Sequence, residues 1–342
     1  MGEMKYLMLS LCMSLLLVLS GCQSTTGNIR IIAGAFNLTT QLQQKLMDRD
    51  APQQVRVLEN IQYQQDPDLS LDVYLPAQTP DDIGLRPAVV WIHGGGWISG
   101  SKAHARGYFK RLADAGYPVF SLQYQLAPAA TYPTQLHQIN QALAYIQEHG
   151  ALFGVDAEQL FLAGDSAGAN LASHYAALLS NPEFAAQSEF VPVLALTQLK
   201  GVILHCGIYD LPHFIETAPD EIKIVEWGIY NMVQAYTGER KQDAEFLQQI
   251  SPIQHITPAF PPVFLSGGNK DFLTDTQSLP LLEVLKQQQV PVKAVFYPDA
   301  KRWLIHEYQF LMHLPESQQT FEQTLSFLAD YSEVDQTDRS AP

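Results

Sequence analysis

The stretch that decides the fold is Leu160-Phe161-Leu162-Ala163-Gly164-Asp165-Ser166-Ala167-Gly168, near the middle of the chain. Its four apolar residues are followed by the pattern G-x-S-x-G, and a helix-like segment then runs from about Ala167 to Leu179. A serine on a tight turn between a strand and a helix is typical of a nucleophile elbow, in which the flanking glycines leave room for the turn. This context predicts that Ser166 is a nucleophile held at the edge of a sheet.

Strand-like and helix-like segments alternate on both sides of this turn. We expect strands at 55–61, 69–75, 88–92, 117–122, 160–163, 202–204, 263–265 and 292–296, and helices at 135–149, 167–179, 279–288 and 319–329. Unbroken apolar strands that alternate with helices indicate an α/β protein with a mostly parallel sheet covered on both faces. The first two strands flank the turn Asp66-Pro67-Asp68, so we expect them to pair with each other.

A glycine run, His93-Gly94-Gly95-Gly96-Trp97, directly follows the strand expected at 88–92. Three consecutive glycines allow backbone N–H groups to converge on one oxygen. Acyl transfer needs such an oxyanion hole to stabilise the negative charge of its tetrahedral intermediates. The glycine run and the elbow together therefore indicate acyl-transfer chemistry.

The serine needs a base, and the base needs an acid to orient it. In the fold that carries this elbow, the acid and then the histidine follow the serine along the chain. Asp271 comes after the strand expected at 263–265, with Asp275 as the alternative four residues later. His306 follows the strand expected at 292–296, whereas its alternative His313 falls inside an expected helical segment at 310–314. We favour Asp271 and His306.

The composition excludes several other classes of protein. The chain has 342 residues, 46% of them hydrophobic, which is too apolar for a disordered protein, and three cysteines are too few for a disulfide scaffold. Lys and Arg number 20 against 35 Asp and Glu, so the formal net charge of −15 argues against nucleic-acid binding. The sequence contains no H-E-x-x-H pair, no Walker A loop and no dinucleotide fingerprint. We therefore expect neither a metal nor a cofactor.

The front of the chain is typical of an export signal. Residues Tyr6 to Leu19 are dominated by apolar side chains and carry no charge, a length that suits a signal peptide better than a membrane span. The sequence Leu19-Ser20-Gly21-Cys22 resembles a bacterial lipobox, which implies cleavage after residue 21 and lipid on Cys22. Gln23 resembles the choice made by outer-membrane lipoproteins, so we expect an anchored protein of the bacterial cell envelope that faces the periplasm. An ordinary signal peptide, an uncleaved anchor and a start at Met4 rather than Met1 stay open.

The rest of the chain divides by pattern. We expect a tether and helical segment at 22–50, a catalytic domain at 51–332 and a disordered tail at 333–342. Two insertions, about 181–200 and 211–250, are candidates for a cap over the ligand crevice, because loops at the carboxyl ends of parallel strands surround it. A helical elaboration without substrate contact is the alternative. Cys206 lies in an apolar run, so we expect it to be a buried, inert thiol.

These motifs resemble the hormone-sensitive-lipase-like branch of the α/β-hydrolases, the carboxylesterases with an HGGGW motif. The similarity runs from about residue 55 to 331 and includes Tyr124-Gln-Leu-Ala-Pro128, similar to the family's Y-R-L-A-P segment, and Ser251-Pro252. It implies a triad of Ser166, Asp271 and His306. It also implies an oxyanion hole made by the N–H groups of Gly95, Gly96 and Ala167. Two residues depart from the family pattern, because Gln125 replaces an Arg and Ile305 stands where Gly is common.

The expected function is therefore hydrolysis of short- or medium-chain acyl esters by a serine carboxylesterase. An amidase, a formamidase or a deacetylase of acylated sugars is the alternative on the same scaffold. A surface-tethered binding protein with an inactive hydrolase fold is a more remote one. The expected partner is a small-molecule ester, and the membrane is contacted through the lipid alone. The sequence leaves the natural substrate and the oligomeric state open.

Overall fold

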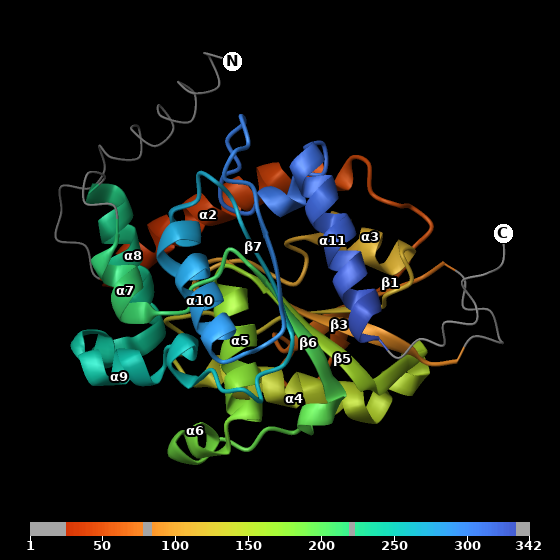
Figure 1. Cartoon of the computed structure of the whole chain (residues 1–342), viewed down its shortest axis with the longest axis horizontal. Helices are drawn as coiled ribbons and strands as arrows, with labels where there is room; N and C mark the ends of the chain where they lie inside the picture. The colour runs from red at the N-terminus through yellow and green to blue at the C-terminus, as the bar shows by residue number, and fades with distance from the viewer. Residues whose placement is uncertain (1–24, 78–83, 219–222, 333–342) are drawn as a thin grey trace.

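A single eight-stranded sheet forms the centre of the molecule (Figure 1). The computed structural model describes residues 25–77, 84–218 and 223–332. The strands are β1 Arg56–Gln62, β2 Ser70–Leu75, β3 Arg86–Ile92, β4 Val119–Leu122, β5 Val155–Asp165, β6 Leu199–His205, β7 Val263–Gly267 and β8 Val292–Phe296. Their order across the sheet is β1-β2-β4-β3-β5-β6-β7-β8. Only β2 runs antiparallel to its neighbours β1 and β4, so the mostly parallel sheet predicted from the sequence is confirmed.

Helices cover both faces of the sheet. They are α2 Thr25–Asp48, α3 Arg106–Asp114, α4 Thr134–His149, α5 Ala167–Ser180, α6 Pro182–Gln187, α7 Leu211–Glu216, α8 Lys223–Thr237, α9 Ala244–Gln249, α10 Leu279–Gln287 and α11 Pro315–Tyr331. Short 3-10 turns are η2 Gly150–Phe153, η3 Leu196–Gln198, η4 Gly238–Gln242, η5 Pro252–His255 and η7 Tyr308–Phe310, and η6 Thr274–Ser278 is a π-helical turn.

Strand β3 shows how the two hydrophobic cores are divided. Its residues are buried without a polar interruption from Pro87 to Ile92, because both of its faces are covered. Val90 belongs to the core that includes Leu143 of α4 and Leu171 of α5. Its neighbour Trp91 belongs to the other core, with Phe109 of α3 and Phe327 of α11. Successive side chains of a strand point to opposite faces, so a continuous apolar run supplies both cores.

The edge hairpin formed by β1 and β2 also confirms a sequence prediction. The two strands pair antiparallel, and the Leu69 N–H donates to the Asp66 carbonyl in the turn between them (2.9 Å). Gln125, which takes the place of the family's arginine, donates from Nε2 to an Asp66 carboxylate oxygen (2.9 Å). The amide of Gln125 therefore fastens the Tyr124–Pro128 segment to this turn without a positive charge.

The amino-terminal segment contains the helix that the sequence predicted, but this helix begins earlier than the expected tether allowed. Helix α2 begins at Thr25, and Ile29 and Ile32 are buried in the core that also contains α4 and α5. Apolar side chains on one face of this helix give it a surface to bury, which a polar tether would lack. The structure therefore joins α2 to the catalytic domain. Residues 1–24 and the tail 333–342 lie outside the described residues.

One of the two proposed cap insertions was placed wrongly. Segment 181–200 connects the end of α5 to the start of β6, and both lie at the amino ends of the strands, away from Ser166. Asn140 of α4 holds it there, because its amide donates to the Val191 carbonyl (3.0 Å) and accepts from the Val193 N–H (2.8 Å). The sequence interpretation overlooked that a loop from a helix to the next strand returns to the edge opposite the crevice.

Candidate active site

Ser166 occupies the sharp turn between β5 and α5. Its backbone angles are φ 51° and ψ −120°, a strained conformation for a residue with a side chain. The Ser166 N–H donates to the His205 carbonyl of the neighbouring strand β6 (2.9 Å), which fixes the turn to the sheet. A Cβ at Gly168 would lie 2.0 Å from the Ile92 carbonyl oxygen, and one at Gly164 would lie 2.4 Å from the carbonyl carbon of Gly168. The glycine spacing of the sequence pattern is therefore a requirement of close backbone packing.

The glycine loop packs directly against this elbow. The Gly94 N–H donates to Asp165 Oδ2 (2.9 Å), and a Cβ built on Gly94 would lie 3.1 Å from the Ser166 Cβ. Gly95 and Gly96 have φ values of 106° and 60°, which glycine adopts at little cost. The Gly95 carbonyl accepts from both the N–H (3.0 Å) and the hydroxyl (2.8 Å) of Ser99, which holds this peptide in one orientation.

Ala167, the third residue expected in the oxyanion hole, is the first residue of α5. Its N–H belongs to the first turn of the helix and has no acceptor within the helix. The positive end of the helix dipole lies at the same place. Ala167 is adjacent to Ser166 on the elbow, and Gly94 places the start of the glycine loop beside the serine. The oxyanion hole of Gly95, Gly96 and Ala167 stays a prediction.

His306 and Asp271 form a close pair on two other loops. The His306 Nδ1 and the Asp271 Oδ2 lie 2.7 Å apart, and the other carboxylate oxygen of Asp271 accepts from the Leu273 N–H (3.1 Å). Asp271 is 4% exposed and directly follows the turn after β7. Burial lowers the pKa of His306, but the neighbouring Asp271 carboxylate and Cys206 outweigh it and raise the pKa well above its usual value. Asp271 therefore orients the imidazole and stabilises its charged form.

The two alternatives considered in the sequence analysis have no such contact. Asp275 is exposed within η6. His313 lies in a turn before α11 rather than in the expected helical segment, because that helix begins only at Pro315, a residue suited to the first helical position. Among the described residues, no hydrogen bond or ion pair joins Asp275 or His313 to Asp271 or His306.

Cys206 is a site residue that the sequence interpretation missed. It is buried and free, as expected, and burial raises the pKa of its thiol. Its thiol lies within hydrogen-bonding reach of the His306 imidazole, and it directly follows His205, whose carbonyl holds the Ser166 N–H. Cys206 therefore links the elbow to the histidine loop. Its apolar sequence context predicted only burial.

Two helices contact the glycine loop: α8, which belongs to the insertion 211–250, and α2. A Cβ on Gly96 would lie 2.4 Å from the Met232 sulfur of α8 and 3.3 Å from the Phe36 ring of α2. Trp97 stacks on Tyr236 of α8, with ring centroids 4.5 Å apart. The insertion 211–250 thus reaches the site, as the sequence suggested. The contribution of Phe36 was missed, because α2 precedes the whole catalytic domain in the chain.

Behind the elbow lies a buried cluster of three titratable side chains. The His104 Nε2 is 3.4 Å from Glu307 Oε2 and 3.8 Å from Asp165 Oδ2, and all three side chains are almost inaccessible to solvent. Burial lowers the pKa of His104, but Glu307 and Asp165 raise it to about 9. Burial raises the pKa of Glu307, but His104 lowers it to about 2. Burial raises the pKa of Asp165 to about 6 despite the opposing effect of His104.

Two groups of side chains bring atoms that could bind a metal within 4.8 Å of one another. They are Cys206, Asp271 and His306, and His104, Asp165 and Glu307. In the second group both oxygens of Asp165 already accept hydrogen bonds, from the Trp91 indole N–H and the Gly94 N–H (2.9 Å each). In the first group Asp271 Oδ2 is 2.7 Å from the His306 imidazole. The Asp165 and Asp271 carboxylates therefore already have hydrogen-bond partners within the protein.

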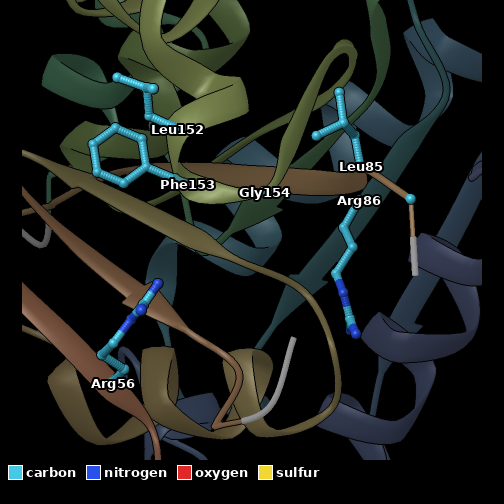
Figure 2. Close-up of a pocket in the computed structure, with 7 residues that line it drawn as sticks. Arg56, Leu85, Arg86, Leu152, Phe153 and Gly154 are labelled. Carbon is cyan, nitrogen blue, oxygen red and sulfur yellow. The ribbon is translucent and has the colours of Figure 1, made fainter. Parts of the chain in front are cut away.

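A separate cavity of about 320 Å³ lies at the amino-terminal ends of strands β3 and β5 (Figure 2). Its lining includes Arg86 at the start of β3 and Gly154 just before β5. Ser166 follows the carboxyl end of β5, so this cavity takes no part in the site described above.

Comparison with known proteins agrees with the fold. The family description BD-FAE matches residues 71–285, more than half of the chain. The chain belongs to the BD-FAE family. The matched range includes the glycine loop, Ser166 and Asp271, while His306 lies beyond it.

Named relatives are esterases or lipases. The chain is 26% identical over 251 residues to the probable isoprenylcysteine alpha-carbonyl methylesterase ICMEL1 of Oryza sativa subsp. japonica, covering 71% of this chain and 56% of that protein. It is 40% identical over 104 residues to the hormone-sensitive lipase of Bos taurus, covering 30% of this chain and 13% of the lipase. The chain thus spans about half the length, or less, of these curated relatives.

Solved structures show the same architecture. Esterase B from Lactobacillus rhamnosis superposes with a TM-score of 0.76 at 25% identity, covering 90% of this BD-FAE chain and 96% of esterase B. The mostly parallel sheet with helices on both faces is therefore an α/β-hydrolase fold, as the motifs predicted.

The membrane-related predictions stay predictions. Within the parts of the chain that the structure describes, no helix is both long and apolar enough to cross a membrane. The apolar segment Tyr6 to Leu19 and the lipobox cysteine Cys22 lie outside the described residues.

Proposed function

We propose that this BD-FAE chain is a serine carboxylesterase that hydrolyses short- to medium-chain acyl esters. The observation that carries the proposal is the 2.7 Å contact between His306 and Asp271 on loops that also meet the Ser166 elbow through Cys206. The esterase relatives support hydrolysis of carboxylic esters. One related structure, esterase B, is described with a C4-C4 tributyrin phosphonate inhibitor, which supports a preference for short acyl groups.

The mechanism follows from the positions of these side chains. Asp271 engages Nδ1 of His306, so the imidazole Nε2 is left to take the Ser166 proton as the hydroxyl attacks the ester carbonyl. The N–H groups of Gly95, Gly96 and Ala167 stabilise the oxyanion, and each such donor is typically worth about 10²–10³ in rate. His306 then protonates the leaving alcohol. Water, activated by the same imidazole, hydrolyses the acyl-enzyme and restores Ser166.

Hydrolysis of p-nitrophenyl acetate, butyrate, octanoate and palmitate by the purified protein tests this proposal. We expect the highest kcat/KM on the shorter esters and a loss of at least about 10³ in kcat for Ser166→Ala. Ser188→Ala, at the opposite edge of the sheet, is the matched control. A fluorophosphonate probe should label Ser166 alone. Equal rates for wild type and Ser166→Ala would exclude the proposal, and faster turnover of matched amides or acetylated sugars would favour an amidase or deacetylase.

We also propose that Cys22 carries a lipid that anchors the protein to the bacterial envelope, facing the periplasm. The support is the uncharged apolar segment before Cys22, which is typical of an export signal, and the lipobox sequence that ends at this cysteine. Metabolic labelling with a palmitate analogue should mark wild type but not Cys22→Ser. Cys12→Ser changes a cysteine within the apolar segment and should label as wild type does. Labelling of Cys22→Ser at the wild-type level would exclude the anchor.

A further inference from the structure

The buried cluster behind the elbow joins the three loops that build the site. Asp165 directly precedes Ser166 and holds the glycine loop through the Gly94 N–H (2.9 Å). Glu307 directly follows His306 on the histidine loop. His104 lies between the two carboxylates, 3.8 Å from Asp165 Oδ2 and 3.4 Å from Glu307 Oε2. The three side chains thus connect the nucleophile, the oxyanion loop and the base.

Glu307 adopts a backbone conformation that argues for a specific role of its side chain. Its φ of 60° lies in the left-handed region, which glycine adopts more easily than glutamate does. Its side chain is also buried, and a buried carboxylate is costly unless it is paired. Hydrophobic packing does not explain a strained, buried glutamate. The contact with His104 provides the compensating interaction.

We propose that the ion pair between His104 and Glu307 is a positioning device that holds the His306 imidazole at the correct place relative to Ser166. The proposal rests on the serine mechanism proposed above. His104 and Glu307 do not touch substrate and act through their neighbours. Because Glu307 and His306 are adjacent in sequence, a shift of the Glu307 side chain moves the imidazole, while Asp165 keeps the serine and Gly94 in place.

The ion pair also predicts how kcat depends on pH. The titratable groups that face His104 are Glu307 and His306 on the histidine loop, Asp165 at the elbow and His93 of the glycine loop. The two carboxylates stabilise the imidazolium and outweigh the opposing effect of His306. Deprotonation of His104 at alkaline pH therefore breaks the pair. We expect kcat to fall above about pH 9, and variants without the pair to lack this alkaline decrease.

The decisive variant is Glu307→Gly, because glycine takes the left-handed conformation without strain and removes the carboxylate. A merely structural role would predict that activity falls only in proportion to the unfolded fraction. Glycine relieves the backbone strain but leaves the buried His104 without its main partner, so we expect a lower melting temperature, with the variant still folded at the assay temperature. The kcat should nevertheless fall by about a hundredfold, the cost of a displaced catalytic group, with KM changed by less than about threefold.

His104→Gln and the double variant complete the comparison. We expect His104→Gln to lower kcat by a similar factor, and the double variant to be no worse than either single variant, because both remove one coupled interaction. Glu316→Gln is the matched control. It removes the ion pair (3.3 Å) between Glu316 at the start of α11 and Arg302, which lies on the histidine loop and is about half exposed. This change should leave kcat unchanged.

A spectroscopic readout reports the pair directly. In protein labelled with ¹⁵N-histidine, the His104 ring should show the protonated form at pH 8 in wild type and the neutral form in Glu307→Gly. Wild-type kcat in Glu307→Gly, or fully additive losses in the double variant, would overturn the proposal. If Ser166→Ala is inactive while Glu307→Gly is fully active, only this inference fails. If Ser166→Ala is as active as wild type, the proposed function itself fails.

Discussion

At Gly168 the elbow backbone passes so close to the glycine loop that no side chain fits. A Cβ there would lie 2.0 Å from the Ile92 carbonyl oxygen, and this oxygen belongs to the rigid backbone of β3. We expect Gly168→Ala to lower the free energy of unfolding by at least about 2 kcal/mol, as overpacking of a core does. Gly34→Ala is the control, because Gly34 lies in α2 with open space around it. It should raise the free energy of unfolding by up to about 1 kcal/mol through helix propensity. Urea unfolding of both variants checks the contrast, and equal values would contradict it.

Asp271 and Asp275 give a second contrast at the residue scale. Asp271 is buried and 2.7 Å from His306, whereas Asp275 is exposed four residues later. An amide at position 271 would favour the wrong imidazole tautomer, so we expect Asp271→Asn to lower kcat by about 10⁴ with little change in KM. Asp275→Asn should keep wild-type kinetics. Steady-state rates on p-nitrophenyl butyrate measure both, and a larger loss in Asp275→Asn would reverse the assignment.

At the scale of the element, α2 reaches the glycine loop beside Ser166, so we expect it to contribute to the substrate site. Its Phe36 ring lies beside Gly96 next to Met232 of α8. Phe36→Ala removes a ring and opens space next to the glycine loop. We therefore expect longer acyl chains to be favoured: kcat/KM on octanoate, divided by kcat/KM on acetate, should rise about tenfold. This is the usual scale for a methylene in an apolar pocket. The ratio does not depend on the folded fraction. Leu38→Ala, an exposed position on the same helix, should leave it unchanged. An unchanged ratio in Phe36→Ala would remove α2 from the substrate site.

The elements differ in how far the sequence could predict them. The strand–turn–helix context of Ser166 and the turn at Asp66 depend on neighbours within a few residues, so local patterns identified them. The sequence predicted the pairing of Asp271 with His306 because both residues follow expected strands and come after Ser166 in the order acid, then histidine. The contact of Phe36 with Gly96, and that of His104 with Glu307, joins residues far apart in the chain. No local pattern marks such contacts, although a charged residue next to a catalytic candidate was a signal that could have singled out Glu307.

For the whole molecule, buried histidines set the dependence of stability on pH. Burial lowers the pKa of His93, His174 and His205 to about 3 each, below the value of about 6.5 in an unfolded chain. Below pH 6.5 the unfolded state therefore binds more protons than the folded state, and stability is lost as pH falls toward 3. Asp165, with its pKa raised to about 6, opposes this trend with a single proton. His104, raised to about 9, contributes stability that is complete below pH 6.5 and lost as pH rises through 9.

The sum of these titrations predicts a maximum in the free energy of unfolding near pH 6.5, with a steeper decrease on the acid side. Each proton contributes a slope of about 1.4 kcal/mol per pH unit, so three histidines outweigh the single Asp165. His174→Phe is the sharpest test, because the ring packs against Tyr132 and Phe184, with centroids 5.5 and 5.4 Å away. Phenylalanine keeps these ring contacts and cannot titrate, so the acid slope between pH 4.5 and 6 should fall by about one proton. Urea unfolding at half-unit pH steps measures it. An unchanged slope would mean that His174 is not a buried neutral group. The alkaline side, which depends on the raised pKa values of His104 and His306, should be the same in both proteins.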